Sequence, residues 1–385
     1  MLKAAIGVSD DIDLEDAIEQ VLSQCRKQLG DTLPQVGILF TSCMDADFQF
    51  VLDRFNTALP SMELIGCTTD GEISPRLGFS EDSVALLLLS SDTAVFSTAL
   101  AENISATPRE SIFKAFIEAK QKLDGEPHLA IVFPDGLTTI ATSLDTIFRE
   151  IMGDIFPVIG GTAGDHFLLS TTYQFYGKRV LTDSMPVLLI GGQVACSVNV
   201  VTGLVPYGQY YKLSQVEKNI VYQVGDLSVL DFYQREFGLI SDSYPHFSFS
   251  VYPKGSEDHF FRSPIAYDKN TCSMQFIGQF PEDCRVRLAR VLREDIRRSA
   301  DEANRKLLEK IDGEYPELIL IFSCTSRRHV LGSETNLEFE LLRNSSEKTP
   351  FFGFYCYGEI GPLKLGSPTR FHSGTFISLA LRSCR

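Results

Sequence analysis

The chain has 385 residues, of which 44% are hydrophobic and 22% are charged, and its formal net charge at pH 7 is -15. These values are typical of a globular protein that buries a substantial core, and the length favours two or more domains over one. The negative charge argues against nonspecific binding to nucleic acid or to an anionic membrane, because both are negatively charged themselves. We therefore expect neither as a partner.

The segments that would direct a protein to a membrane or out of the cell are not found in the sequence. The longest apolar run, Val84–Leu89, is too short to span a bilayer, and the N-terminal segment lacks the apolar core of a signal peptide. The nine cysteines are scattered, odd in number and free of Cys-x-x-Cys pairs, which argues against a disulfide framework and a zinc site. These observations predict a cytoplasmic protein.

Three segments of the sequence share one plan. Each begins with a short apolar run that suits a buried strand, continues through a polar turn and a helical stretch, and ends in a second apolar run before a glycine-rich turn. The first apolar runs are Val36–Phe40, Leu129–Phe133 and Leu318–Phe322. The strand–helix–strand order favours parallel pairing with a right-handed crossover.

A further apolar strand follows each glycine-rich turn. These strands are expected at Asp82–Ser90, Met185–Val194 and Gly374–Leu381. We therefore predict an α/β fold of repeated strand–helix–strand units, arranged as two related and closely packed domains. Because the sequence leaves the repeat around residues 209–216, we place the domains at residues 1–215 and 216–385.

One phrase occurs twice, as GCTTDGEIS at Gly66–Ser74 and as GFYCYGEIG at Gly353–Gly361. The repeat explains it as the turn between two strands. Its acidic residues, Glu72 and Glu359, follow strand ends, where open α/β sheets bind their ligands. The alternative is a structural role, in which each glutamate accepts hydrogen bonds from neighbouring backbone N–H groups and fixes the turn.

The stretch Phe322–Gly332 brings Arg327 and Arg328 to the end of the first strand of the third copy. A guanidinium group is a planar donor that matches a carboxylate or a phosphate, so these arginines are candidate ligand-binding residues. The alternative is a salt bridge to a glutamate close by in the sequence. The candidate partners are Glu334, Glu338 and Glu340.

Two tyrosines precede the second Gly-Glu-Ile turn. The period of two along a strand predicts that Tyr355 and Tyr357 point to the same face, where they could line a polar pocket with Glu359. Alternatively, they cover the half-exposed face of a strand.

Histidine and cysteine provide weaker candidates. His166 follows the glycine-rich GGTAGD, which matches neither nucleotide-binding loop motif, and His372 begins the last strand. A lone histidine is more often a core or surface residue than a ligand, but one histidine suffices to hold haem iron. Cys67 and Cys324 lie at strand ends, where a nucleophile could act, although the sequence suggests no base for either.

Together these phrases, with FHSGTF after them, resemble the FIST proteins, which carry an N-terminal and a C-terminal FIST domain. The resemblance extends over nearly the whole chain. Arg327, Tyr355, Tyr357, Glu359 and His372 match positions of the family pattern. The loop at residues 325–326 departs from it, because Thr and Ser stand where a glycine is expected beside the arginine pair.

The resemblance implies a signal-input module that binds a small ligand, for which amino acids have been proposed, and that acts on a histidine kinase or a cyclic-dinucleotide signalling protein. One stand-alone branch of similar length and layout is described as haem-binding nitric oxide sensors. A non-enzymatic, haem-based nitric oxide sensor is therefore the most specific prediction, with haem as cofactor and His372 or His166 as candidate iron ligands.

Three alternatives stay open. The first is a sensor of an amino acid or another small carboxylate, built on the arginine loop with Tyr355, Tyr357 and Glu359. The second is an enzyme that depends on Cys67 or Cys324. The third is an interaction scaffold without a ligand, suggested by the acidic composition and by an arginine-rich helix.

Overall fold

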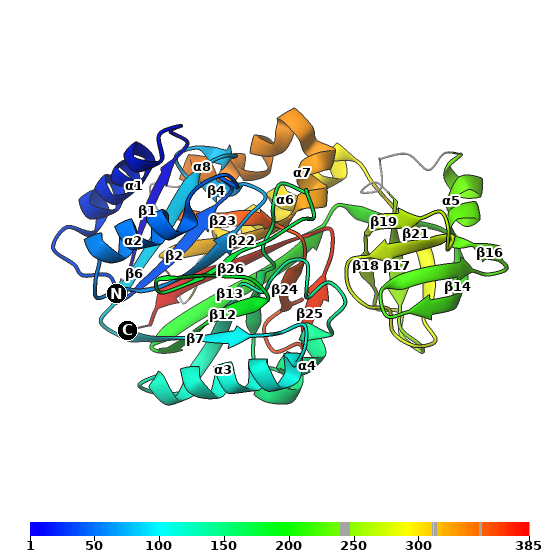
Figure 1. Cartoon of the computed structure of the whole chain (residues 1–385), viewed down its shortest axis with the longest axis horizontal. Coiled ribbons are helices and arrows are strands. Elements are labelled where there is room, and N and C mark those ends of the chain that lie inside the picture. Colours follow the sequence, from blue (N-terminus) through cyan, green and yellow to red (C-terminus); the bar gives the residue numbers. More distant parts are fainter. Residues whose placement is uncertain (239–246, 310, 312–313, 346–348, 385) are drawn as a thin grey trace.

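The computed structural model describes residues 1–238, 247–309, 311, 314–345 and 349–384 (Figure 1). Its architecture is mixed α/β, as predicted, and the described strands form four sheets. Three of the sheets belong to three repeated units that form the larger body, on the left of Figure 1. The fourth belongs to an inserted β-domain, on the right.

The first unit contains the first predicted strand–helix–strand segment. Its elements are β1 (Leu2–Ser9), α1 (Leu14–Leu29), β2 (Val36–Thr41), α2 (Phe48–Ala58), β3 (Glu63–Thr68) and β6 (Val84–Ser91). Strand β2 pairs with β3 in parallel and with β6 antiparallel. The Asp13 side chain caps α1 by accepting from the backbone of Glu15 and Asp16, and Gly30 ends the helix with a positive φ.

The second and third units repeat this order. The second contains β7 (Ala94–Glu102), α3 (Pro108–Lys122), β8 (Pro127–Val132), α4 (Leu144–Met152), β9 (Val158–Gly161) and β12 (Ser184–Gly192). The third contains β13 (Val194–Thr202), α6 (Arg293–Leu307), β22 (Leu318–Cys324), α7 (Thr325–Leu331), η2 (Gly332–Phe339), α8 (Glu340–Ser345), β23 (Phe351–Cys356) and β26 (Thr375–Ser383). Strands β8 and β9 are parallel, as are β22 and β23, which confirms the predicted repeat.

Each unit also contributes a hairpin to the sheet of another unit. The hairpins are β4 (Glu72–Ser74) with β5 (Gly78–Ser80), β10 (Gln174–Tyr176) with β11 (Arg179–Leu181), and β24 (Glu359–Pro362) with β25 (Thr369–His372). Strand β4 of the first unit pairs with β23 of the third, β10 of the second with β3 of the first, and β24 of the third with β9 of the second. This cyclic exchange links the three units through backbone hydrogen bonds.

The same glycine position explains why the parallel strands lie so close in every unit. A Cβ atom built on Gly66, Gly160 or Gly353 would lie within about 2 Å of a carbonyl oxygen of the neighbouring parallel strand. A side chain at these positions therefore cannot be accommodated without moving the backbone. The repeated glycine is a requirement of the sheet, and it explains part of the duplicated phrase.

The main core lies between the three sheets, and the helices cover their outer faces. Each predicted first strand ends in a phenylalanine, and these rings meet at the centre. The Phe40 ring centroid lies 5.2 Å from that of Phe133, which lies 6.3 Å from that of Phe322. Each unit thus contributes one phenylalanine ring to the aromatic contacts that join the three units.

The inserted β-domain lies between β13 and α6. Its elements are β14 (Leu204–Glu217), β15 (Ile220–Val224), β16 (Leu227–Ser228), α5 (Val229–Phe237), β17 (Phe247–Tyr252), β18 (Phe260–Arg262), β19 (Pro264–Asp268), β20 (Ser273–Phe276) and β21 (Arg285–Val291). It has its own hydrophobic core around Phe232, Phe249 and Phe276. The domain boundary predicted between residues 215 and 216 falls within β14 and stays a prediction.

Candidate functional site

The parallel strands of all three units end at one place, where their loops meet. We call this region the loop junction and define it by residues 42–47, 69–71, 162–173, 325–331 and 357–358. Backbone bonds join the units there: Asp70 N donates to Tyr355 O at 3.0 Å, and Gly164 N donates to Thr68 O at 3.0 Å. The carboxyl ends of parallel strands are the usual ligand-binding edge of such folds, so the junction is the candidate site.

Glu72 and Glu359 begin the exchanged hairpins. Glu72 pairs with Phe354 and Glu359 with Gly161, each one residue after the close-packed glycine of the receiving strand. The third hairpin has Gln174 at the same register, opposite Cys67. Glu72, Gln174 and Glu359 therefore occupy equivalent positions in the three units. The sequence does not reveal Gln174 as the third of them, because a longer loop separates it from its glycine-rich turn.

The two glutamates are fully buried and bound by uncharged donors. Glu72 accepts from Ser42 Oγ at 2.8 Å and from the hydroxyls of Thr69 and Ser83. Glu359 accepts from Thr375 N at 2.9 Å and from its hydroxyl at 2.6 Å. Desolvation raises the pKa of each carboxyl to about 7, against which the hydroxyl hydrogen bonds act. This geometry favours a structural role for both glutamates, but the donors differ from those expected: Glu72 accepts from hydroxyl groups, and among the described residues Glu359 accepts a backbone N–H only from Thr375.

Arg327 and Tyr355 meet at a buried carboxylate. Arg327 Nε donates to Glu338 Oε1 at 2.7 Å, and the Tyr355 hydroxyl donates to the other oxygen of Glu338 at 2.5 Å. The exposed fractions of the three residues are 2%, 0% and 0%. Burial raises the pKa of the Tyr355 phenol well above its usual value, so the phenol stays a donor. This cluster packs the third unit and opens to no cavity among the described pockets.

Tyr357 lies one residue beyond β23 and binds a different carboxylate. Its hydroxyl contacts Asp165, whose oxygens also accept from the backbone of Leu169, Ser170 and Thr171. Asp165 thereby holds a loop in which His166, Phe167 and Leu169 all have positive φ, between 53° and 59°. Each such residue costs of the order of 1 kcal/mol or more, and strain of this kind clusters at ligand-binding and switch segments.

Arg328 joins the third unit to the first. Its Nη1 donates to Asp70 Oδ2 at 2.7 Å and to Asp70 O at 3.1 Å, and its Nη2 is paired with Glu81. Asp70 is fully buried and its Oδ1 accepts no hydrogen bond from a described residue, whereas the side chains of Arg328 and Glu81 are 16% and 41% exposed. Desolvation raises the pKa of Asp70, against the attraction of Arg328. The Arg328–Glu81 pair is the solvent-facing part of this network.

His166 lies beside the same pair. Its Nε2 contacts Ser42 O and lies 3.6 Å from Asp82 Oδ1, and its Nδ1 lies 3.9 Å from Glu81 Oε1. These residues border an open cleft of about 790 Å³. The cleft is strongly acidic; its carboxylates are Asp10, Asp11, Asp45, Asp47, Glu81 and Asp82. A cation or an ammonium group is favoured in such surroundings.

The two candidate haem ligands are poorly placed to hold an iron porphyrin. His372 is 3% exposed, lines none of the described pockets, and has its Nε2 2.9 Å from Gly361 O, while desolvation lowers its pKa to about 4. His166 borders the acidic cleft, whose carboxylates would repel haem propionates. Within the described residues, no group of three or more histidine, cysteine or acidic side chains could hold a metal ion. Neither candidate histidine is placed to fit haem.

The cysteines of the enzymatic alternative are fully enclosed. Cys67 and Cys324 are 0% and 1% exposed. Desolvation raises the pKa of both thiols, and the charge of Glu72 acts on Cys67 in the same direction. Since the thiolate is the nucleophile, these surroundings suit buried structural cysteines.

The residues predicted from the sequence thus do not form one common site, because they belong to separate clusters of contacts. His166 lines the acidic cleft and Arg328 is paired with Glu81 of its lining, whereas Arg327, Tyr355, Glu72 and Glu359 are enclosed. Sequence reasoning missed Asp70 and Asp165 in the loop junction and Glu81 beside it, which are the carboxylates that Arg328 and Tyr357 contact. Asp70 lies within the duplicated phrase at the position of Tyr357, and that equivalence was the available signal.

Comparisons with known proteins agree with the sequence resemblance. The model of the FIST N domain matches residues 35–226, and the model of the FIST C domain matches residues 230–362. An uncharacterized protein of Methanocaldococcus jannaschii is 26% identical over 213 residues, which are 53% of this chain and 40% of that protein. The matched region therefore spans less than half the length of this relative.

Among solved structures, a cyanuric acid hydrolase from A. caulinodans aligns over the full length of both chains with 8% identity and a TM-score of 0.34. A likeness at this level says nothing about activity. In the described part of the chain, no helix is both long and apolar enough to cross a membrane.

Proposed function

The chain belongs to the family of FIST-domain proteins, and from this premise we propose that it is a non-enzymatic sensory protein that binds an α-amino acid at the loop junction. FIST domains are associated with signal transduction and small-ligand sensing. The proposed output is regulation of a signalling partner, such as a histidine kinase or a cyclic-dinucleotide enzyme. The cytoplasmic location expected from the sequence belongs to the same proposal.

The solvent-facing ion pair between Arg328 and Glu81 carries the choice of ligand. An α-amino acid has a carboxylate that matches the guanidinium group and an ammonium group that matches Glu81 and the neighbouring Asp82. A zwitterion inserted between the two side chains replaces one ion pair by two. Asp70, fully buried beneath Arg328, keeps the guanidinium in position while Glu81 is displaced.

The acidic cleft beside the pair supports the same ligand class. Its carboxylates attract the ammonium end, and its volume of about 790 Å³ leaves space for a side chain. His166 and the strained loop around it border the cleft. Binding at this point acts on contacts between the first, second and third units together, which gives a route from ligand to partner surface.

Haem-based nitric oxide sensing, the most specific sequence prediction, rests on the family resemblance. The amino-acid version has better support from the side chains, because neither His166 nor His372 combines a free ring nitrogen with an apolar cavity. The two versions are separated by the absorbance spectrum of the purified protein with added haem, in the ferrous state, before and after nitric oxide. A sharp Soret band that shifts with nitric oxide would favour the haem sensor.

The amino-acid proposal is tested by the melting temperature of the protein with each of the common amino acids. An amino acid at 100 times its Kd stabilises the native state by about 2.7 kcal/mol, and the melting temperature rises accordingly. We expect Glu81→Gln to remove this response, because the ammonium group loses its partner. Glu126→Gln is the matched control, since Glu126 is exposed and distant from the cleft.

Two results would contradict the proposal. One is a screen in which no amino acid raises the melting temperature of the wild-type protein. The other is an equal response of the wild-type protein and the Glu81→Gln variant, which would place the ligand elsewhere.

A further inference from the structure

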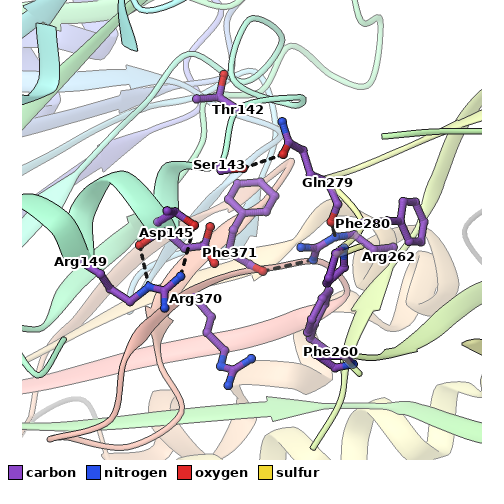
Figure 2. A pocket seen from close by; sticks show the side chains of 14 residues that line it. Thr142, Ser143, Asp145, Arg149, Phe260, Arg262, Gln279, Phe280, Arg370 and Phe371 are labelled. Carbon is purple, nitrogen blue, oxygen red and sulfur yellow. Dashed lines mark hydrogen bonds between the residues drawn. The ribbon is translucent and has the colours of Figure 1, made fainter. Parts of the chain in front are cut away.

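A second pocket lies where the inserted β-domain meets the three-unit body (Figure 2). Its volume is about 280 Å³. Helix α4 and the loop before it form one wall, β25 forms the second, and β18 with residues 278–281 forms the third. The pocket is separate from the loop junction, and none of the residues predicted from the sequence lines it.

Arg262 is the central cation of this pocket. It is 5% exposed, and its Nε donates to Gln279 O at 2.9 Å while its Nη1 donates to Phe261 O at 3.0 Å and Phe371 O at 3.2 Å. The guanidinium carbon lies 4.2 Å from the centroid of the Phe260 ring. Every protein acceptor is thus a neutral carbonyl, and no carboxylate forms a salt bridge with Arg262 in the described part of the chain.

The backbone is shaped to leave room for this guanidinium group. Gly278 has a φ of +83°, and a Cβ atom at this position would lie 2.8 Å from the guanidinium carbon of Arg262. Gly278 N also donates to Ile140 O at 3.1 Å across the domain joint. The position of Arg262 therefore follows from the local backbone and is no accident of a flexible side chain.

The charges around Arg262 leave an excess of cations. Arg149 and Arg370 also line the pocket, and neither forms a salt bridge with a described residue. Asp145 is the acidic residue of the lining, and it too lies beyond salt-bridge distance of a described cation. Desolvation lowers the pKa of Arg262 to about 10, the charge of Asp145 acts against this shift and that of Arg370 acts with it, and the group is still protonated at neutral pH.

Burying a cation without a carboxylate in salt-bridge contact is costly, and the single carboxylate of the lining, Asp145, does not balance three guanidinium groups. An anion from outside the chain would supply the missing negative charge. The lining has three guanidinium groups and one carboxylate, so its net charge is +2. A ligand with two negative charges would balance it. The Phe260, Phe280 and Phe371 rings offer an apolar surface for the rest of such a molecule.

We propose that this pocket binds a small organic dianion, a phosphate monoester or a dicarboxylate, with its charged end between Arg262 and Arg370. Arginine is suited to both groups because its planar fork donates two parallel hydrogen bonds. The site is additional to the amino-acid site and does not depend on it. Ser143 Oγ donates to Gln279 Oε1 at 2.6 Å across the joint between the body and the inserted domain. A ligand in this pocket would therefore contact both sides of the joint.

Isothermal titration with phenyl phosphate tests the proposal, and phthalate and benzoate are titrated beside it. Phenyl phosphate and phthalate separate the phosphate source from the dicarboxylate source, and benzoate is the monoanionic comparison. We expect one of the two dianions to bind with one site per chain and benzoate to bind at least about tenfold more weakly, because it carries half the charge. Failure of both dianions to bind at millimolar concentrations would overturn the proposal.

Arg370→Ala is the main variant, because Arg370 is only half-buried and we expect its removal to leave the fold intact. We expect the Kd of the bound dianion to rise about 10- to 100-fold, as for a lost charge-assisted hydrogen bond. Arg26→Ala removes the same charge from an exposed face of α1 and should leave the Kd unchanged. Equal losses in both variants would show nonspecific attraction and overturn the proposal.

Arg262→Lys provides an independent check, since a lysine keeps the charge but not the planar fork. We expect a Kd at least about tenfold higher, with an unchanged response to amino acids at the loop junction. A Kd equal to that of the wild-type protein would remove Arg262 from the site.

Discussion

Arg327 and Arg262 are both buried, with 2% and 5% of their surface exposed, but their charges are balanced in different ways. Arg327 is bound by Glu338, whose second oxygen accepts from Tyr355. Arg262 donates to backbone carbonyl oxygens and packs on phenylalanine rings. We infer that a buried charge balanced by a carboxylate of the chain is part of the scaffold, whereas one bound only by neutral groups is available to an anionic ligand.

The largest expected effect comes from making Arg327 resemble Arg262. Glu338→Gln keeps the size of the side chain but leaves the Arg327 guanidinium buried without a counter-charge. We expect the free energy of unfolding to fall by about 3–5 kcal/mol, the cost of breaking a buried ion pair from one side. Guanidinium chloride unfolding at neutral pH measures the change.

Glu340→Gln serves as the control for this variant, because Glu340 is exposed and only two residues away. Its unfolding free energy should stay within about 0.5 kcal/mol of the wild-type value. A similar small change for Glu338→Gln would mean that the ion pair adds little, and the distinction between the two arginines would lose its basis.

The same distinction applies to the buried carboxylates. Glu338 is paired with a cation, whereas Glu72 and Glu359 accept hydrogen bonds from uncharged groups. The pKa of each hairpin glutamate rises from 4.5 to about 7 on folding because of desolvation. A raised carboxyl pKa means that the native state binds the proton more tightly. The stabilising contribution is therefore complete below pH 4.5 and is lost as the pH rises through 7.

We expect the double variant Glu72→Gln with Glu359→Gln to lose this dependence. Between pH 4.5 and 8 the wild-type protein should lose roughly 3 kcal/mol of unfolding free energy per glutamate relative to the variant. The second unit shows that an amide is tolerated, since Gln174 accepts from Ser184 Oγ at 3.1 Å at the same position. Parallel pH profiles of the two proteins would show that neither glutamate changes its pKa on folding.

Much of the fold could be predicted because the repeat is visible as local pattern. Each unit shows an apolar run, an amphipathic helix and a glycine-rich turn, and these signals suffice for the parallel pairs β2–β3, β8–β9 and β22–β23. The exchange of hairpins was not predictable. Strand β4 pairs with β23 about 280 residues away, and no local property of a three-residue strand names its partner.

The candidate site shows the same limit. Arg328 was identified because an arginine pair at a strand end is a local signal, but its partners Asp70 and Glu81 come from another unit. Arg262 gave no signal, since a single arginine in a β-rich segment becomes unusual only when its surroundings are known. Its significance depends on the lack of a salt bridge to any described carboxylate, which only the three-dimensional packing of the inserted domain determines.

The smallest expected effect comes from a substitution that changes the balance of charge in the pocket of Arg262. Asp145 lines this pocket and its charge opposes that of a bound dianion. Asp145→Asn should lower the Kd of phenyl phosphate or phthalate roughly threefold, since a partly exposed charge contributes less than about 1 kcal/mol. The gain should shrink at high salt, because screening weakens the repulsion that the substitution removes. Asp124→Asn, at an exposed position after α3, makes the same change in net charge away from the pocket. If both variants tighten binding equally, the effect is one of overall charge; if Asp145→Asn alone does so, the anion lies between α4 and the inserted domain.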